Sequence, residues 1–347
     1  MTTYLCTWLY LEEKGKESYY PQVSFKSSSP IFQNIYWKCV AVFFYSAVLF
    51  NKEKNDVKYL FFTNISKELI PNNLDGFDLK KLFEKEEIEV VTLPLTYEVP
   101  QDYFSAWRNQ FYIFDMFKYV TTNEKYCMDD NFIILDCDCI INNDLDEMIK
   151  KLEQHKILLY CLEYDISHVV NGLSRQQMKE VYEDILNIKL DCIPRYYGGE
   201  IVAAKKEVIK ELYEEFTNLF PVMLERNKQK KLKFNEEAQT LSFLYYKLGF
   251  ENNEANKFIK RIWTSPKCYN FTEGDMYLYI LHLPYEKKYG YNELFAKLNK
   301  LGFRYINKDC FRKLLKSTMR LEKNDVVGNT KLILRWIRYK ILKILYR

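Results

Sequence analysis

The first half of the chain alternates short β-like runs with helix-like runs. The β-like runs are rich in branched and aromatic residues, whereas the helix-like runs repeat apolar residues at helical spacing. Strands that alternate with helices in this order are typical of an open α/β sheet. We therefore expect strands at residues 4–11, 58–63, 88–93, 131–135 and 157–162, and helices at 31–50, 79–85, 108–120 and 145–154.

The second half is more helical and less regular. With 347 residues, the chain has enough material for one large domain or two modest ones. We expect one large domain over residues 1–290, a helical extension over 291–322 and a basic helix over 331–347. Within the second half, helices are expected at 206–224, 234–249, 292–301 and 308–321, a β-like run at 271–283 and a linker at 323–330.

Two carboxylates follow the most apolar short run, NFIIL at residues 131–135. In open α/β sheets, ligands bind beyond the carboxyl ends of the strands, which is where Asp136 and Asp138 are expected. Such a pair can bind a divalent cation that neutralises a diphosphate. Acids at strand ends are also common because that edge is solvated. The apolar residues on both sides, including Cys139 to Ile141, favour the functional interpretation.

The segment NFIILDCDCIINNDLDEM at 131–148 resembles the metal-binding segment of GT-A glycosyltransferases, and its pattern is closest to the family 8-like enzymes. The resemblance implies a Rossmann-like open mixed sheet flanked by helices, here with a helical C-terminal extension. It also implies a nucleotide-sugar donor, with Asp136 touching metal and donor. In these enzymes the second aspartate, here Asp138, and a much later histidine complete the metal site.

Three histidines are available for that role. His155 falls in a polar helix end and His168 in a loop, whereas His282 ends a β-like run and is followed by Lys287. The resemblance implies that His282 binds the metal and that Lys287 binds the donor, although the family's glycine and Pro-Trp pair are missing here. An imidazole ligand favours Mn²⁺ over Mg²⁺. His282 as an ordinary core or turn histidine is the alternative.

Gly198 and Gly199 form the only Gly-Gly pair of the chain and precede a β-like run. Paired glycines allow a backbone to approach a ligand closely. The resemblance implies that this segment lines the sugar pocket, with Glu200 on donor hydroxyls and Glu237 facing the acceptor as the catalytic carboxylates. A plain hairpin turn is the alternative for the glycines, and a helix-dipole contact in a first turn is the alternative for Glu237.

Weaker candidates lie upstream of the carboxylate pair. The resemblance places the nucleobase at the end of the first strand, near Thr7 and Trp8, and an acidic contact to the donor at Asp115. Aromatic residues make up 17% of the chain, so one tryptophan at that position is weak support for base stacking.

Charge and cysteine usage indicate where the protein works. The last 17 residues carry six basic residues and no acid, so the rest of the chain has a net charge of −2 and does not suit a nucleic-acid binder. The basic residues of 331–347 lie outside one apolar arc, which is typical of a helix at an anionic membrane surface. A helix docked on the body or at an oligomer interface is the alternative.

Nine cysteines without regular spacing, the absence of a signal peptide and an apolar run too short to span a bilayer indicate a cytoplasmic protein, peripheral at the inner face of the membrane. We therefore expect a Mn²⁺- or Mg²⁺-dependent hexosyltransferase, retaining rather than inverting. It would transfer sugar from a UDP-linked donor to a glycan or lipid-linked acceptor in bacterial capsule or lipopolysaccharide synthesis. The alternatives are a nucleotidyltransferase, which would usually have a glycine-rich phosphate loop, and a non-catalytic membrane-associated binding protein.

Overall fold

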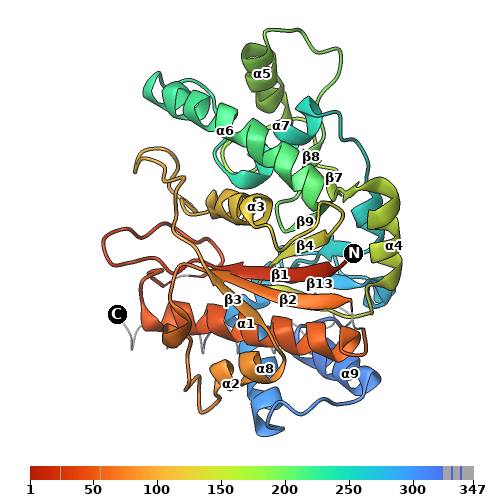
Figure 1. The fold of residues 1–347 in the computed structure, drawn as a ribbon. Helices are drawn as coiled ribbons and strands as arrows, with labels where there is room; N and C mark the ends of the chain where they lie inside the picture. Colours follow the sequence, from red (N-terminus) through yellow and green to blue (C-terminus); the bar gives the residue numbers. More distant parts are fainter. Residues whose placement is uncertain (24, 55, 323–329, 331–336, 338–347) are drawn as a thin grey trace. The chain divides into compact units, whose positions relative to one another are not determined.

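The computed structural model describes residues 1–23, 25–54, 56–322, 330 and 337. Its main sheet has six strands in the order β3-β2-β1-β4-β9-β6. The β2–β3 pair is parallel and the β6–β9 pair is antiparallel, so the sheet is mixed. The expected α/β class with an open mixed sheet and interspersed helices is confirmed (Figure 1). The sheet strands are β1 (Thr3–Leu9), β2 (Val57–Thr63), β3 (Glu89–Thr92), β4 (Asn131–Asp136), β6 (Ile157–Leu158) and β9 (Ile201–Lys205).

The chain folds into two compact units, each made of three separate segments of the sequence. Unit 1 comprises residues 1–4, 93–134 and 148–256, and unit 2 comprises residues 5–92, 135–147 and 257–347. The expected boundary at residue 290 stays a prediction, and the predicted helix at 331–347 lies, apart from Ile337, outside the described residues.

In unit 2, α1 (Pro30–Asn51) forms the largest part of the core. Ser29 caps its N-terminus, Pro30 occupies its first turn, and sixteen of its residues are buried. The rings of Trp37 and Phe44 pack on Phe61 of β2, which fixes the helix against the sheet. The remaining helices of this unit are α2 (Leu79–Lys85), capped by Asp78, α8 (Gly290–Lys300) and α9 (Lys308–Thr318), together with the 3-10 helices η1 (Lys67–Leu69), η3 (Glu273–Tyr277) and η4 (Pro284–Lys288).

A second, three-stranded sheet in unit 2 has the order β10-β13-β5. Strand β5 (Cys139–Ile141) pairs antiparallel with β13 (Ile280–His282), which pairs parallel with β10 (Ile259–Arg261). A short hairpin of β11 (Thr264–Ser265) and β12 (Cys268–Tyr269) follows β10. This small sheet brings segments together that are about 140 residues apart in the sequence.

Unit 1 is built on the packing of α3 (Tyr112–Thr122) against α6 (Lys206–Lys228). The rings of Phe114 and Phe216 are stacked with centroids 3.5 Å apart and planes 3° apart. The other elements of this unit are α5 (Arg175–Leu186), α7 (Glu237–Lys247), η2 (Glu254–Lys257), and the strands β7 (Cys161–Leu162) and β8 (Tyr196–Tyr197), which form a two-stranded sheet; α4 (Asp146–His155) begins in unit 2 and continues into unit 1.

Two expectations about secondary structure are wrong in part, and one helix was not expected. The single strand expected at 157–162 is divided into β6 and β7, which belong to different sheets, because the side-chain amides of Asn252 and Asn256 bind the backbone of Leu159 and Cys161. The β-like run expected at 271–283 is a strand only at its end, in β13, while residues 273–277 form the 3-10 helix η3, which begins in a capping box of Thr272 and Asp275. Helix α5 was not expected, although it also begins in a capping box.

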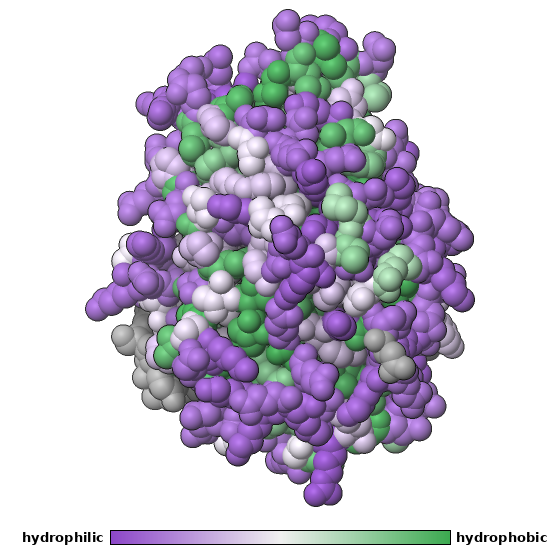
Figure 2. All heavy atoms as spheres, in the orientation of Figure 1, coloured by the Kyte–Doolittle hydropathy of each residue, from purple (hydrophilic) through white to green (hydrophobic). Residues whose placement is uncertain are grey.

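Among the described residues, no helix combines the length and the hydropathy needed to cross a membrane. On the face drawn in Figure 2, hydrophilic side chains cover most of the surface and apolar residues appear in separate patches. The nine cysteines, all within the described ranges, are free thiols, and five of them are at least partly buried. The irregular cysteine spacing did not indicate a disulfide framework, and these free thiols agree with that expectation.

Candidate functional site

The carboxylate pair lies between two buried strands, β4 and β5. Asp136 is the last residue of β4, and Asp138 immediately precedes β5. The two strands bury almost every side chain, so the backbone around the pair is held on both sides by core packing. The side chain of Asp136 is one-third exposed, whereas that of Asp138 is 1% exposed. One carboxylate of the pair is therefore accessible to solvent and the other is enclosed.

Strand pairing brings His282 to Asp138. In the antiparallel ladder of β5 and β13, His282 lies opposite Cys139, and the backbone N–H of Leu283 donates to the carbonyl of Asp138 over 3.0 Å. The Nε2 atom of His282 is 3.2 Å from Oδ2 of Asp138 and 3.9 Å from Oδ2 of Asp136. One ligand atom from each of the three residues lies within 4.8 Å of the other two. The three residues expected to form a metal site are therefore brought together.

Lys287 contacts the enclosed carboxylate from η4. Its Nζ is 2.9 Å from Oδ2 of Asp138 and 5.3 Å from the centre of the Tyr36 ring, on α1. Burial acts to raise the pKa of Asp138, but the neighbouring Lys287 ammonium and His282 imidazole outweigh it and hold the pKa well below its usual range. Burial acts to lower the pKa of Lys287, but the charge of Asp138 outweighs it and raises this pKa. Both groups are therefore ionised at neutral pH.

The donor set suits a divalent cation. Two carboxylates and one imidazole are ligands that bind Mn²⁺, and carboxylates alone also bind Mg²⁺. Oδ2 of Asp138 is buried, with Nζ of Lys287 at 2.9 Å and Nε2 of His282 at 3.2 Å. The residues fit a metal centre because the ligand atoms of two carboxylates and one imidazole lie within 4.8 Å of one another.

A second group of predicted residues gathers in unit 1, around the Gly-Gly pair between β8 and β9. A Cβ atom added to Gly198 would lie 2.2 Å from Oε2 of Glu200, and one added to Gly199 would lie 2.6 Å from Oε1 of Glu237. Glu200 is 1% and Glu237 is 8% exposed. A side chain at either position would force a buried carboxylate to move away from the backbone. The near neighbours of the glycine backbone are protein carboxylates, and a role of the pair in a sugar pocket stays a prediction.

Sequence reasoning missed a hydrogen-bond network next to these carboxylates. Glu236, the N-cap residue of α7, accepts from the Tyr196 hydroxyl over 2.6 Å at one oxygen and from the Asn171 amide at the other. The adjacent Gln239 amide donates to the carbonyl of Val170 over 2.9 Å. These bonds fix the beginning of α7, and therefore the position of Glu237. The only signal in the sequence was the acidic pair itself at the beginning of a helix.

The weaker candidates have structural contacts of their own. The Thr7 hydroxyl donates to the carbonyl of Leu135 over 2.8 Å, and Trp8 is half-buried on β1. Asp115 is 3% exposed and accepts from the backbone N–H of Thr96 over 2.9 Å, and burial raises the pKa of its carboxyl. A donor-binding role for these three residues stays a prediction. His168 is exposed and stacks on the Tyr164 ring, as fits a residue outside the metal centre.

No protein-family model and no curated protein matches the sequence. Among solved structures, the chain is similar to the apo form of mouse xyloside xylosyltransferase 1, with 10% identity, a TM-score of 0.47, and coverage of 81% of this chain and 97% of that one. It is also similar to the galactosyltransferase LgtC in complex with donor and acceptor sugar analogues, with 10% identity, a TM-score of 0.42, and coverage of 80% and 86%. Both are glycosyltransferases by name, and the likeness concerns the fold alone.

Proposed function

We propose that the chain is a metal-dependent glycosyltransferase that moves a hexose from a UDP-linked donor to a glycan or lipid-linked acceptor. The observation that carries the proposal is the group of the partly exposed Asp136 with the buried Asp138 and His282, and the Lys287 ammonium beside it. Such a group concentrates positive charge, from a bound cation and from a lysine, at one point of a sheet edge. A nucleoside diphosphate is the leaving group that this arrangement suits.

The reaction breaks the bond between the anomeric carbon and a β-phosphate oxygen, and the electron pair leaves on that oxygen. The oxygen of an acceptor hydroxyl bonds to the anomeric carbon, and a base takes its proton. A Mn²⁺ or Mg²⁺ ion bound by the three residues would stabilise the charge on the departing diphosphate. Lys287 contributes a further positive charge beside Asp138, at a position set by η4 and the Tyr36 ring.

The carboxylates of unit 1 are assigned to the sugars. We propose that Glu200, fixed against Gly198, binds donor hydroxyls, and that Glu237 faces the acceptor. Both are candidates for the base that takes the acceptor proton. Their burial beside a bare glycine backbone supports this role, because a sugar hydroxyl needs a carboxylate held in one position. Retention of configuration is proposed from the resemblance of the metal-binding segment, as is base stacking on Trp8 and donor binding by Asp115.

The acceptor and the location follow from the charge of the tail. We propose that residues 331–347 bind an anionic membrane surface at the cytoplasmic face, which would give the enzyme access to lipid-linked glycans of a bacterial capsule or lipopolysaccharide. Sedimentation with vesicles tests this part separately. Loss of the tail is expected to abolish binding to vesicles that contain an anionic lipid, and vesicles of neutral lipid are the control.

The central proposal is tested by isothermal titration calorimetry of UDP binding to the protein, with and without Mn²⁺. A second assay measures the release of sugar from UDP-glucose, UDP-galactose and UDP-xylose. Binding is expected only with the metal. Asp138→Asn is expected to abolish it, while Asp144→Asn, which removes the same charge from an exposed side chain six residues later, is expected to have no effect. Metal-dependent binding that is unaltered in Asp138→Asn would show that the site assignment is wrong.

A further inference from the structure

The ladder that brings the metal ligands together is very short. Strands β5 and β13 share three residue pairs, from Cys139 opposite His282 to Ile141 opposite Ile280. A slip of one residue would turn every side chain of a strand to the opposite face of the sheet. The separation of Asp138 from His282 therefore depends on what fixes the far end of this ladder.

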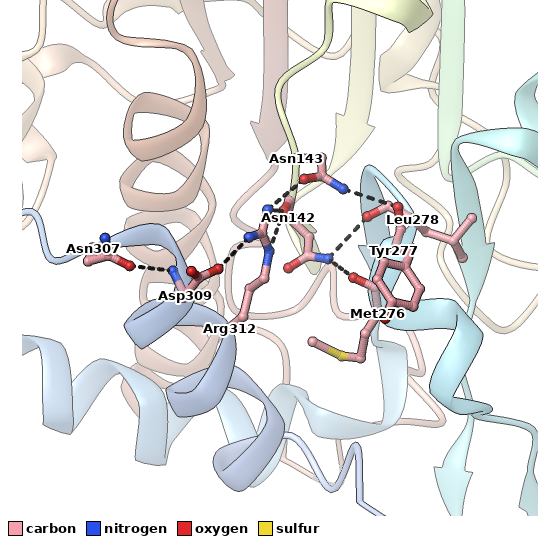
Figure 3. Close-up of polar contacts among 8 residues, drawn as sticks. All are labelled: Asn142, Asn143, Met276, Tyr277, Leu278, Asn307, Asp309 and Arg312. Atoms are coloured by element: carbon pink, nitrogen blue, oxygen red, sulfur yellow. Dashed lines mark hydrogen bonds and ion pairs between the residues drawn. The ribbon is translucent and has the colours of Figure 1, made fainter.

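Two asparagines close that end (Figure 3). The backbone N–H of Asn142 donates to the carbonyl of Tyr279 over 2.8 Å, and its side-chain amide donates to the carbonyls of Met276 and Leu278 over 2.7 and 3.1 Å. The Asn143 amide donates to the carbonyl of Tyr277 over 3.1 Å. The residues that follow β5 are thereby tied to those that precede β13, so the register is fixed by side chains as well as by the ladder.

Arg312 on α9 holds the asparagines in turn. Its Nε and Nη2 atoms donate to the carbonyl of Asn142 over 3.3 and 3.0 Å, and Nη2 also donates to the Asn143 side chain (Figure 3). Its Nη1 donates to Asp309 over 2.9 Å, and the guanidinium lies 5.1 Å from the centre of the Phe50 ring on α1. A planar fork with several donors is suited to hold several oxygens at fixed angles. Lysine, with a single ammonium, does not reproduce this geometry.

We propose that Arg312 is a positioning residue of the metal centre. It fixes the C-terminal end of β5 against the segment before β13, and so keeps His282 opposite Cys139 and its Nε2 atom 3.2 Å from Oδ2 of Asp138. The inference rests on the proposed metal centre. It adds to that centre a residue that contacts none of the three proposed metal ligands. Groups behind metal ligands commonly change metal affinity by about 10–100-fold when they are removed. Because Arg312 acts through the strand, we expect a smaller loss of Mn²⁺ affinity, about three- to tenfold, in Arg312→Ala.

The sign of this effect separates positioning from simple electrostatics. Removing a positive charge strengthens cation binding on Coulomb grounds, so a weaker affinity in Arg312→Ala has the opposite sign. Lys313→Ala is the matched control, because it removes the same charge from an exposed residue next to Arg312 on α9. It is expected to leave the affinity unchanged or slightly higher. Arg312→Lys keeps the charge but not the fork, and is expected to restore only part of the affinity.

In the experiment, Mn²⁺ is titrated into the full chain, and the electron paramagnetic resonance signals of the free and bound ion measure the binding. Circular dichroism at the same temperature verifies that each variant is folded. Weaker binding and a broader bound-ion spectrum in Arg312→Ala support the proposal. If the wild type binds Mn²⁺ and Arg312→Ala binds it with the same affinity, only the positioning role is overturned. If the wild type does not bind Mn²⁺, the metal centre itself is overturned. If Arg312→Ala does not fold, Asn143→Ala removes one acceptor of the guanidinium and is judged by the same criteria.

Discussion

Replacement of Asp138 by asparagine separates the proposed role of this carboxylate as a metal ligand from its role as the partner of a buried lysine. The substitution keeps the size of the side chain and removes its charge. Lys287, whose side chain is 11% exposed, then loses the carboxylate 2.9 Å from its Nζ. Removing one partner of a buried ion pair usually costs about 3–5 kcal/mol, because the other charge stays buried without compensation. We expect the free energy of unfolding without metal to fall by about 3 kcal/mol.

Metal adds a second, independent measurement. A ligand that binds only the native state stabilises it by mass action, by about 2.7 kcal/mol at a concentration one hundred times its dissociation constant. The wild type is therefore expected to gain stability in Mn²⁺, and Asp138→Asn is expected to gain almost none. Urea unfolding in Mn²⁺ and in a chelator, for both proteins, gives the four free energies that are needed.

A double variant distinguishes the two contributions. In Asp138→Asn/Lys287→Met the uncompensated ammonium is absent, so the free energy of unfolding in chelator is expected to return to within about 1 kcal/mol of the wild type. The Mn²⁺-dependent gain stays absent, since the carboxylate is still missing. The reasoning is refuted if Asp138→Asn retains the full metal-dependent gain, or if the double variant is as unstable as the single one.

Three further predictions concern other parts of the chain. Gly199→Ala places a Cβ 2.6 Å from Oε1 of Glu237, so sugar transfer should fall at least about tenfold in kinetic assays, while Mn²⁺ affinity in unit 2 stays unchanged. Phe216→Ala removes a ring stacked on Phe114 and should lower the free energy of unfolding by about 3–5 kcal/mol in urea; a loss below about 1 kcal/mol contradicts this packing. Burial acts to raise the pKa of Glu86, but hydrogen bonds from Lys85 and Lys52 outweigh it and lower this pKa. The ionised Glu86 therefore stabilises the native state by about 1 kcal/mol, a small amount because both lysines are exposed. This stabilisation is present above pH 4.5, the ordinary pKa of a glutamate, and is lost as the pH falls through the lowered pKa of the native state. Urea unfolding of wild type and Glu86→Gln at pH 7 and pH 3 should show the difference between them shrink.

Local signals were sufficient for most helices and for the strand before the carboxylates. The helix expected at 79–85 is α2 with the same bounds, because Asp78 caps it and its apolar residues have helical spacing. The run at 131–135 lies in β4, because a short run of four consecutive apolar side chains is typical of a strand covered on both faces. The strand expected at 157–162 failed because Asn252 and Asn256, about 95 residues away, take over its backbone hydrogen bonds.

The candidate site also contains residues that the sequence indicated and contacts that it did not. The sequence contained Asp136 and Asp138 as a visible pair, and the resemblance of the surrounding segment singled out His282 and Lys287. The contact of Lys287 with Asp138 and the Tyr36 ring was not foreseeable, because it depends on the path of η4 past α1. The support of Glu237 by the hydrogen bonds of Glu236 likewise depends on a loop more than 60 residues upstream.

The sequence by itself thus determined the α/β class, most of the helices and the residue types that suit a divalent cation, because periodicity, caps and apolar runs act within a few residues. Only the tertiary structure decided that Asp138 is enclosed while Asp136 is partly exposed, and that His282 lies opposite Cys139. The physical reason is the range of the forces. Burial and strand register arise from contacts between segments about 140 residues apart, and a carboxylate becomes a buried metal ligand only when such contacts exclude water from it.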